Sequence, residues 1–237
     1  MRGCFVTGTD TGAGKTVLAA SIVAALAAAG ERVAAFKPVV TGLDEPAGDW
    51  PADHELLALA AGGGVAGGDV CAAAFGPAVS PHLAAQLAGV ELTLDVFVAA
   101  AAAAARAAGA GAALVVEGVG GLLVPFNDRH GVRDLAVALG LAVIIAARPG
   151  LGTINHALLT LKAARAVGLE VRGVVLTPWP EQPSVMERSN HATIERLGSV
   201  EVATLPLLAP RIDELAAAGA ALPLQRWIAA RPAPSAP

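Results

Sequence analysis

Aromatic residues, cysteines and runs of basic residues are scarce in this chain of 237 residues. Phe, Trp and Tyr make up 3% of it, and the formal net charge is −4 at pH 7. No run of Lys and Arg occurs, so we expect no surface that binds nucleic acid. Cys4 falls in an apolar run typical of a strand and Cys71 in a predicted loop. Two isolated cysteines without the spacing of metal ligands indicate reduced thiols, and hence a cytoplasmic protein.

Long apolar runs are also absent, although the mean hydropathy is +0.61. Alanine drives this value, and the longest candidate span, 96–105, ends at Arg106. A membrane-spanning helix needs about 20 apolar residues, so this segment predicts an ordinary helix. The N-terminus lacks the charged and apolar segments of a secretory signal. We therefore expect no membrane partner.

Short apolar runs alternate with helical patterns along the chain. The runs are apolar almost throughout, as in strands buried on both faces of a parallel sheet. The predicted strands are 3–7, 32–36, 112–117, 142–146, 171–177 and 201–205. The predicted helices are 16–29, 53–61, 81–88, 94–108, 132–139, 153–167, 184–197 and 211–218. This alternation predicts an α/β fold with a doubly wound, mostly parallel sheet and helices on both faces, of the P-loop NTPase type.

Residues 1–230 are expected to form a single P-loop α/β domain, because neither a linker nor a repeat divides them. The glycine-rich segment 62–68 predicts a surface loop, and the proline-rich residues 231–237 predict a disordered tail. Ligands of a doubly wound sheet bind at the carboxyl ends of the strands, so polar residues there are the candidates for a site.

The segment from Gly8 to Thr16 predicts a phosphate-binding loop. It lies between the first predicted strand and the first predicted helix, and it ends in Gly-Lys-Thr. Backbone N–H groups of such a loop surround phosphate oxygens, and the helix N-terminus adds partial positive charge. Lys15 would reach the β- and γ-phosphates, and the Thr16 hydroxyl would hold Mg²⁺. The first glycine is Gly8 rather than residue 9, so the loop is one residue longer than the usual form.

A chance match in a glycine- and alanine-rich chain is the alternative, but a strand and a helix flank this loop as the motif requires. We therefore expect the chain to bind a nucleoside triphosphate. The expected nucleotide-binding residues of the loop are Gly12, Ala13, Gly14, Lys15, Thr16 and Val17.

Two charged residues stand where the second and third predicted strands end. Lys37 could neutralise charge during phosphoryl transfer, from the side opposite Lys15, or it could be a solvated loop lysine. Glu117 ends a long apolar strand, as the Mg²⁺-binding acid of P-loop proteins does, or it could be a carboxylate that faces solvent. Gly118 and Gly120 after it would let the backbone approach a ligand closely.

Asp53 opens a predicted helix after a stretch rich in proline, glycine and aspartate. It could be a second carboxylate ligand of Mg²⁺, with Asp49 as the competing candidate, or it could simply cap the helix. Thr41 could contact a substrate through its hydroxyl.

A second strand, glycine turn and helix N-terminus fall within residues 148–156, without the lysine of a phosphate loop. Free N–H groups there suit a carboxylate, although capping by Thr153 explains the segment equally well. His156 and His82 have no partner visible in the sequence and are expected on a helix surface or in the core. A nucleotide base would lie where the late strands end, at Thr177, Pro206, Leu207 and Leu208.

Taken together, these segments resemble the dethiobiotin synthetases, the ATP-dependent carboxylase-cyclases of biotin synthesis. The likeness runs from residue 3 to about residue 215 and includes the longer loop. The matching segments, in the family's order, are Thr7–Thr11 with Gly14–Thr16, Lys37–Val39 with Thr41–Gly42, Ser80–His82, Glu117–Gly121 and Leu151–His156. Two positions depart from the family pattern. Thr177 stands where many members carry an asparagine at the base pocket, and Gly12 stands where larger residues occur.

The resemblance implies that 7,8-diaminononanoate, CO₂ and MgATP react to give dethiobiotin, ADP and phosphate. The path runs through a carbamate and a carbamic-phosphoric anhydride, and it fits a site with two lysines and no covalent nucleophile. The implied catalytic residues are Lys15, Lys37 and Thr11, and the implied Mg²⁺ ligands are Thr16, Asp53 and Glu117. The implied substrate contacts are Thr41 and Gly118, together with Gly150, Leu151, Thr153 and Asn155 of a second copy in a homodimer.

Two other families share parts of this pattern. Amidoligases of the cobyrinic or cobyric acid type usually carry a glutaminase domain with a nucleophilic cysteine, and we find no such segment after residue 215. Partitioning ATPases of the ParA and MinD kind carry a signature lysine at the position of Asp10, and they act on DNA or membrane. Asp10, the acidic pI of about 5.7 and the proline-rich tail argue against that class.

Overall fold

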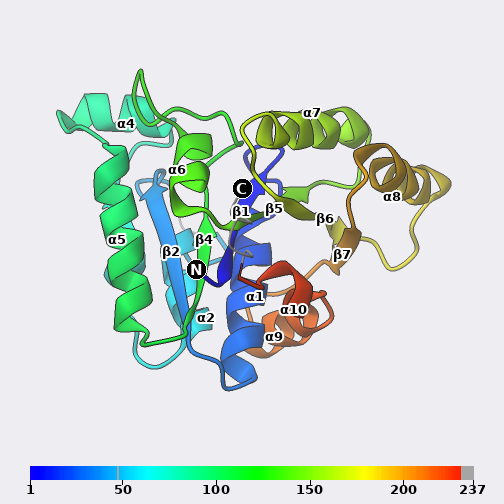
Figure 1. The fold of residues 1–237 in the computed structure, drawn as a ribbon, viewed down its shortest axis with the longest axis horizontal. Helices are drawn as coiled ribbons and strands as arrows, with labels where there is room; N and C mark the ends of the chain where they lie inside the picture. Colours follow the sequence, from blue (N-terminus) through cyan, green and yellow to red (C-terminus); the bar gives the residue numbers. More distant parts are fainter. Residues whose placement is uncertain (47, 231–237) are drawn as a thin grey trace, which may run out of the picture.

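The computed structural model describes residues 1–46 and 48–230, and Figure 1 shows their arrangement. A seven-stranded sheet has the order β3-β2-β4-β1-β5-β6-β7, and its neighbouring strands are parallel throughout. An isolated antiparallel bridge between Pro125 and Gly131 lies outside the named strands. The expected α/β fold with a doubly wound sheet is therefore confirmed, and the sheet is wholly rather than mostly parallel.

Strands and helices alternate along the chain as the sequence pattern predicts. The strands are β1 (Gly3–Gly8), β2 (Val33–Val40), β3 (Cys71–Ala74), β4 (Ala113–Glu117), β5 (Ala142–Ala147), β6 (Val171–Trp179) and β7 (Val202–Pro206). The helices are α1 (Lys15–Ala28), α2 (Asp53–Ala61), α3 (Gly67–Val70), α4 (Pro81–Ala88), α5 (Leu94–Ala107), α6 (Val132–Leu139), α7 (Thr153–Arg165), α8 (Val185–Gly198), α9 (Ile212–Ala220) and α10 (Leu224–Trp227).

The sequence pattern predicts neither β3 nor the four-residue helices α3 and α10. Cys71, expected in a loop, begins the edge strand β3, which is mostly alanine and has none of the β-branched residues that indicate a strand. The expected surface loop at 62–68 gives way to α3 at Gly67. The predicted tail at 231–237 lies outside the described residues. Cys4 and Cys71 are both free, and burial raises the pKa of the Cys4 thiol to about 12.

The sheet buries an apolar core on each of its faces. One core contains side chains of α1, α2, α9 and α10, and the other contains side chains of α5, α6, α7 and α8. Figure 1 shows these two groups of helices on the two sides of the sheet. The central strands β1, β4 and β5 are buried along their whole length, which explains their continuous apolar sequences.

The strand order places a crevice at the centre of the sheet. β1 lies between β4 and β5, and the chain runs from β1 to one side of the sheet and from β4 to the other. Doubly wound sheets bind ligands at such a switch point, outside the carboxyl ends of the strands. The loop after β1 and Glu117 at the end of β4 both lie there.

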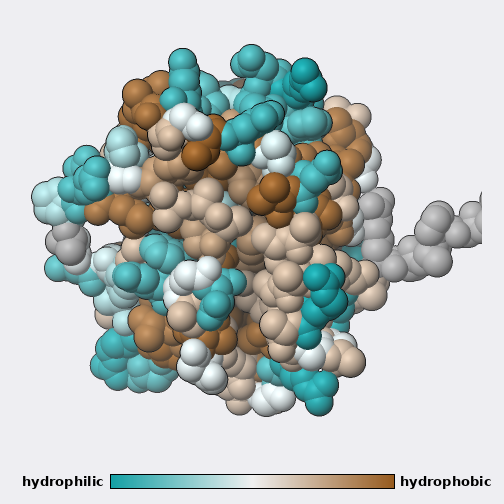
Figure 2. Space-filling model, turned by 90° about the vertical axis from the view of Figure 1, so that its left-hand side faces the viewer, coloured by the Kyte–Doolittle hydropathy of each residue, from teal (hydrophilic) through white to brown (hydrophobic). Residues whose placement is uncertain are grey.

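Alanine contributes to the hydrophobic surface on the side of the molecule where α5 lies, since Ala99, Ala103 and Ala107 of this helix are exposed. The side of the molecule on which α5 lies shows a pale brown area bordered by polar residues in Figure 2. The sequence of α5 includes an alanine run from Ala99 to Ala105. Within the described part of the chain, no helix is long and apolar enough to cross a membrane.

Close packing of α1 against α9 fixes the position of α1, whose first turn faces the crevice. Gly219 of α9 lies so close to α1 that a Cβ at this position would be 2.0 Å from the carbonyl oxygen of Ser21. The helices can approach this closely only because residue 219 has no side chain, so a larger residue must push them apart.

We predict that Gly219→Ala lowers the free energy of unfolding by about 1–3 kcal/mol, because the added methyl group overpacks the contact between α1 and α9. Urea denaturation measures this change. Gly68→Ala is the matched control, because a Cβ at Gly68 meets no atom within 4 Å and the backbone there is not left-handed. Equal stability of the Gly219 and Gly68 variants would contradict the prediction.

Candidate active site

The loop after β1 leads into the N-terminus of α1, and the geometry there suits a bound anion. Gly14 is the N-cap residue with a left-handed φ of 87°. A Cβ on Gly14 would also lie 2.4 Å from Thr177 Cγ2, so only glycine fits. The first turn of α1 contains no acidic residue. Its N–H groups and the positive end of the helix dipole are therefore available to phosphate oxygens.

The Lys15 side chain curls back over this loop, and its Nζ donates a hydrogen bond to the carbonyl oxygen of Asp10 at 2.9 Å. Burial lowers the pKa of Lys15, and the charge of Lys37 adds to this effect against the attraction of Glu117. The ammonium groups of Lys15 and Lys37 thus repel each other, and an anionic ligand bound between them would offset this repulsion.

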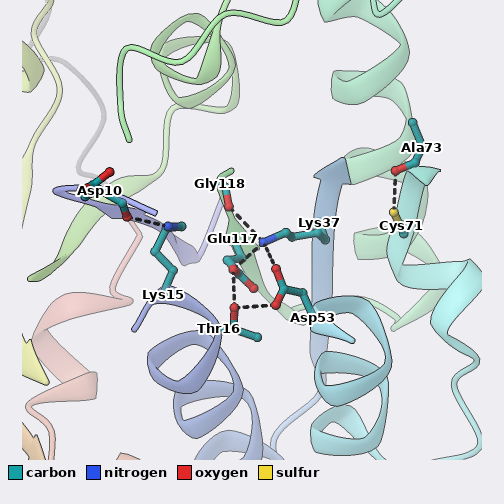
Figure 3. A network of polar contacts seen from close by, with 9 residues as sticks. All are labelled: Asp10, Lys15, Thr16, Lys37, Asp53, Cys71, Ala73, Glu117 and Gly118. Atoms are coloured by element: carbon teal, nitrogen blue, oxygen red, sulfur yellow. Dashed lines mark hydrogen bonds and ion pairs between the residues drawn. The ribbon is translucent and has the colours of Figure 1, made fainter. Parts of the chain in front are cut away.

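Four side chains from four different elements meet beside the loop (Figure 3). Lys37 Nζ lies between two carboxylates, 2.5 Å from Glu117 Oε1 and 2.7 Å from Asp53 Oδ2. Thr16 Oγ1 lies 2.8 Å from Glu117 Oε1 and 2.9 Å from Asp53 Oδ1. Lys37 also donates to the carbonyl oxygen of Gly118 at 3.2 Å. The network joins α1, β2, α2 and β4 at a single point.

Burial and charge act against each other in this network. The side chains of Lys37 and Glu117 are 2% and 0% exposed, and that of Asp53 is 41% exposed. Burial alone would lower the pKa of Lys37, but the carboxylates of Glu117 and Asp53 hold it above its ordinary value. Burial opposes ionisation of Asp53, but the charge of Lys37 and the hydrogen bonds from Lys37 and Thr16 together outweigh it and keep the pKa low. At Glu117 burial dominates and raises the pKa.

Three of the alternatives left open by the sequence are excluded by these contacts. Lys37 is buried and therefore is not a solvated loop lysine, and Glu117 does not face solvent. The expectation that Lys37 follows the second strand is wrong, because β2 continues to Val40 by pairing with β3 beyond Phe36. Asp53 does not cap α2, since the N-cap residue is Ala52. Asp49 is exposed and does not line the cavity beside the loop.

The oxygen atoms of Thr16, Asp53 and Glu117 are a suitable donor set for Mg²⁺. Glu117 Oε2 is buried and has no hydrogen-bond partner among the described residues, so it is free to accept a cation. The described part of the chain contains no cluster of three or more His, Cys, Asp or Glu side chains suited to a metal. A site with one or two carboxylates, completed by phosphate oxygens and water, is the usual arrangement for Mg²⁺.

A cavity of about 670 Å³ opens beside the loop and Lys37. Ten of the predicted site residues line it: Thr11, Gly12, Gly14, Lys15, Thr16, Val17, Lys37, Thr41, Asp53 and Gly120. Glu117 and Gly118 contact Lys37, and Thr177 lies against Gly14. The fold thus brings together residues that are more than 100 positions apart, as Thr16 and Glu117 are.

A second, smaller cavity of about 180 Å³ lies at the N-terminus of α7. Gly150, Leu151 and Thr153 line it together with Ala13 of the loop. Thr153 Oγ1 is buried without a hydrogen-bond partner among the described residues, so its hydroxyl is not used to cap the helix. The Asn190 amide of α8 donates to the carbonyl oxygens of Pro149 and Gly150 and holds this turn.

Some predicted residues lie outside both cavities. Pro206 ends β7 and Leu207 and Leu208 follow it; none of the three lines either cavity, and Leu207 is 81% exposed. Asn155 is exposed and also lines neither. His82 is exposed on α4, as expected for a surface histidine, and its Nδ1 lies 3.0 Å from Ser80 Oγ.

The sequence reasoning missed several residues that form the apolar walls of the larger cavity. These are Val40, Trp50, Pro51, Ala78, Val79 and Val124, with Ser80 beside them. Trp50 lies just before Asp53 and could have been found as one of only three tryptophans in the chain. The others carry no polar chemistry, so nothing in the sequence distinguishes them from core residues.

Comparisons with known proteins identify the family. A family model described as an AAA domain matches residues 2–212. An ATP-dependent dethiobiotin synthetase from Anaeromyxobacter dehalogenans (strain 2CP-C) is 44% identical over 87% of this chain and 90% of its own. The chain belongs to the dethiobiotin synthetase family. Dethiobiotin synthetases from Ralstonia nicotianae and Bacillus subtilis (strain 168) are 42% and 35% identical over 91% and 85% of the chain, and over 93% and 85% of their own.

Solved structures outside the dethiobiotin synthetase family share the fold. The MinC:MinD cell division complex of Aquifex aeolicus superposes with a TM-score of 0.54 at 14% identity, covering 92% of this chain and 86% of that one. Chloroplast FtsY from Physcomitrella patens gives a TM-score of 0.50 at 15% identity, covering 92% of this chain and 64% of that one. At such low identities the likeness concerns the P-loop NTPase fold alone.

We predict that Lys37→Met lowers the free energy of unfolding by about 3–5 kcal/mol at pH 7, because it leaves the buried Glu117 carboxylate unpaired. Urea denaturation without nucleotide or metal measures the loss. The deficit should shrink as the pH falls below 7, since burial raises the pKa of Glu117 and protonation of its carboxylate removes the unpaired charge. Lys162→Met on the exposed side of α7 is the control, and we expect a change below about 0.5 kcal/mol there. A Lys37 variant as stable as this control would refute the argument.

Proposed function

We propose that this chain catalyses the ATP-dependent formation of dethiobiotin from 7,8-diaminononanoate and CO₂, with release of ADP and phosphate. The observation that carries the proposal is the meeting of a phosphate-binding loop, two lysines and Asp53 at one cavity, with the buried Glu117 paired to Lys37 behind it, in a chain of the dethiobiotin synthetase family. Such a site has charge to hold a triphosphate and has no need of a covalent nucleophile.

The proposed reaction has three steps. One amine of the substrate attacks CO₂, and loss of a proton gives a carbamate. A carbamate oxygen then attacks the γ-phosphorus, the bond to ADP breaks, and a carbamic-phosphoric anhydride forms. Finally the second amine attacks the carbonyl carbon, phosphate leaves with its electron pair, and the cyclic urea closes after loss of a proton.

In this scheme Lys15 and Lys37 bind and stabilise the phosphoryl group. The pKa of Lys37 is raised by its carboxylate neighbours, so this side chain remains a cation at neutral pH and can offset negative charge. Thr16, Asp53 and Glu117 would hold Mg²⁺, which neutralises phosphate charge when bound. Gly12, Ala13, Gly14 and Val17 would bind the nucleotide through the loop and first turn of α1.

The diamine is proposed to occupy the larger cavity. Thr11, Thr41 and the backbone of Gly118 would contact its amines and the carbamate, and Gly120 would contact the nucleotide. The apolar walls at Val40, Val79 and Val124 suit a hydrocarbon chain. The nucleotide base would lie near Thr177 and the segment Pro206–Leu208.

We further propose a homodimer in which the carboxylate end of the substrate binds at the N-terminus of α7 of a second copy. Gly150, Leu151, Thr153 and Asn155 would form that site. Three features of this helix start suit a carboxylate: the Thr153 hydroxyl has no hydrogen-bond partner among the described residues, Gly152 at the N-cap is left-handed, and the first turn has no acidic residue. The chain is proposed to act as a single domain in the cytoplasm.

The proposal predicts that ADP release requires both 7,8-diaminononanoate and bicarbonate as well as MgATP. Omitting each in turn in a coupled assay measures this requirement, and mass spectrometry identifies the cyclic urea. ADP release that is indifferent to the diamine would contradict the proposed function.

The proposed Mg²⁺ site predicts different outcomes at the two aspartates. Asp53→Asn should raise the Mg²⁺ concentration for half-maximal activity about tenfold or more, because a carboxylate ligand becomes a neutral amide. Asp49→Asn is the matched control and should keep the Mg²⁺ dependence of the unmodified chain, since Asp49 is exposed and lies outside the cavity. The opposite result would make Asp49 the ligand.

A further inference from the structure

Arg148, directly after β5, donates hydrogen bonds to the backbone of the phosphate-binding loop. Its Nε donates to the carbonyl oxygen of Gly12 at 3.1 Å, and its Nη2 donates to the carbonyl oxygen of Thr11 at 3.3 Å. One edge of the guanidinium therefore spans two successive carbonyl groups, which only the planar fork of arginine can do. The end of β5 adds a third tie, because Ala146 accepts a hydrogen bond from the Thr9 N–H at 2.9 Å.

The absence of a side chain at Gly12 leaves room for these hydrogen bonds. A Cβ at Gly12 would lie 2.7 Å from Arg148 Nη2, and the φ of +69° there already favours glycine. A side chain at position 12 and the guanidinium on the loop backbone thus compete for the same space.

The planar peptide unit links these carbonyl groups to the ligand side of the loop. The carbonyl of Thr11 and the N–H of Gly12 belong to one trans unit, and the carbonyl of Gly12 and the N–H of Ala13 to the next. In a trans unit the C=O and N–H groups point in opposite directions, so fixing the two carbonyls toward Arg148 directs both N–H groups away from it. Neither N–H donates to another described residue.

We propose that Arg148 is a positioning residue of the loop, which orients the N–H groups of Gly12 and Ala13 for the triphosphate through the carbonyls of Thr11 and Gly12. The inference rests on nucleotide binding at this loop, which is part of the proposed function. Arg148 forms no ion pair among the described residues, so its charge is not consumed by a carboxylate of that part of the chain.

The test is the affinity for the magnesium complex of the non-hydrolysable analogue AMP-PNP, measured by isothermal titration calorimetry. We expect Arg148→Gln to raise Kd about tenfold and Arg148→Lys to recover part of the loss, because lysine can satisfy one carbonyl. Arg32→Gln is the matched control: Arg32 is also exposed and also donates to a loop carbonyl, that of Ala110 at 3.0 Å. It should leave Kd unchanged.

Two further readouts separate positioning from a structural role. The unfolding temperature without ligand should be the same in the Arg148→Gln and Arg32→Gln variants. In the Arg148→Gln variant, KM for ATP should rise about tenfold while kcat falls less than threefold.

Gly12→Ala should weaken AMP-PNP binding too, and combining it with Arg148→Gln should add little, because the methyl group already displaces the guanidinium. A Kd of Arg148→Gln equal to that of the unmodified chain, or strictly multiplicative effects in the double variant, overturns the inference. Failure of the unmodified chain to bind AMP-PNP overturns the proposed function, and the inference with it.

Discussion

The buried ammonium group of Lys37, held between Glu117 and Asp53, is the interaction on which the candidate site depends. A carboxylate with no solvent exposure is stable only when it is paired, and Lys37 is the cation that forms an ion pair with Glu117. This requirement ties β2 to β4 and, through Asp53, to α2. The Thr16 hydroxyl on α1 joins the same oxygens, so the two lysines, the two carboxylates and the first turn of α1 are held in one arrangement by the fold.

Small residues set the second constraint, because they let backbones approach the site closely. Gly14 turns the chain into α1 against Thr177, and Gly219 lets α9 support α1 from behind. Gly12 leaves room for a guanidinium at the loop backbone. Many of the alanines that raise the mean hydropathy are buried in the two cores, where their small side chains let the helices pack closely against the central strands.

Local sequence patterns predicted most of the strands and helices. They failed where a segment becomes a strand only by pairing with a neighbouring strand. β1, the loop and α1 could be predicted because the strand, the glycines and the helix are contiguous in the sequence. β3 could not, because Cys71–Ala74 has no strand propensity of its own and is ordered by pairing with β2. The same pairing extends β2 through Lys37 to Val40, beyond the predicted end of this strand at residue 36.

The sequence by itself determined the fold class, the loop and the set of charged residues at strand ends, because periodicity and motif spacing are local properties. Only the tertiary structure decided which of those residues meet. It placed Asp53 rather than Asp49 beside Lys37, buried Lys37 and Glu117 together, built the apolar walls around Trp50 and Val124, and brought Arg148 onto the loop. These are contacts between segments far apart in the chain, and their distances depend on strand order and helix packing, which residue patterns along the chain do not encode.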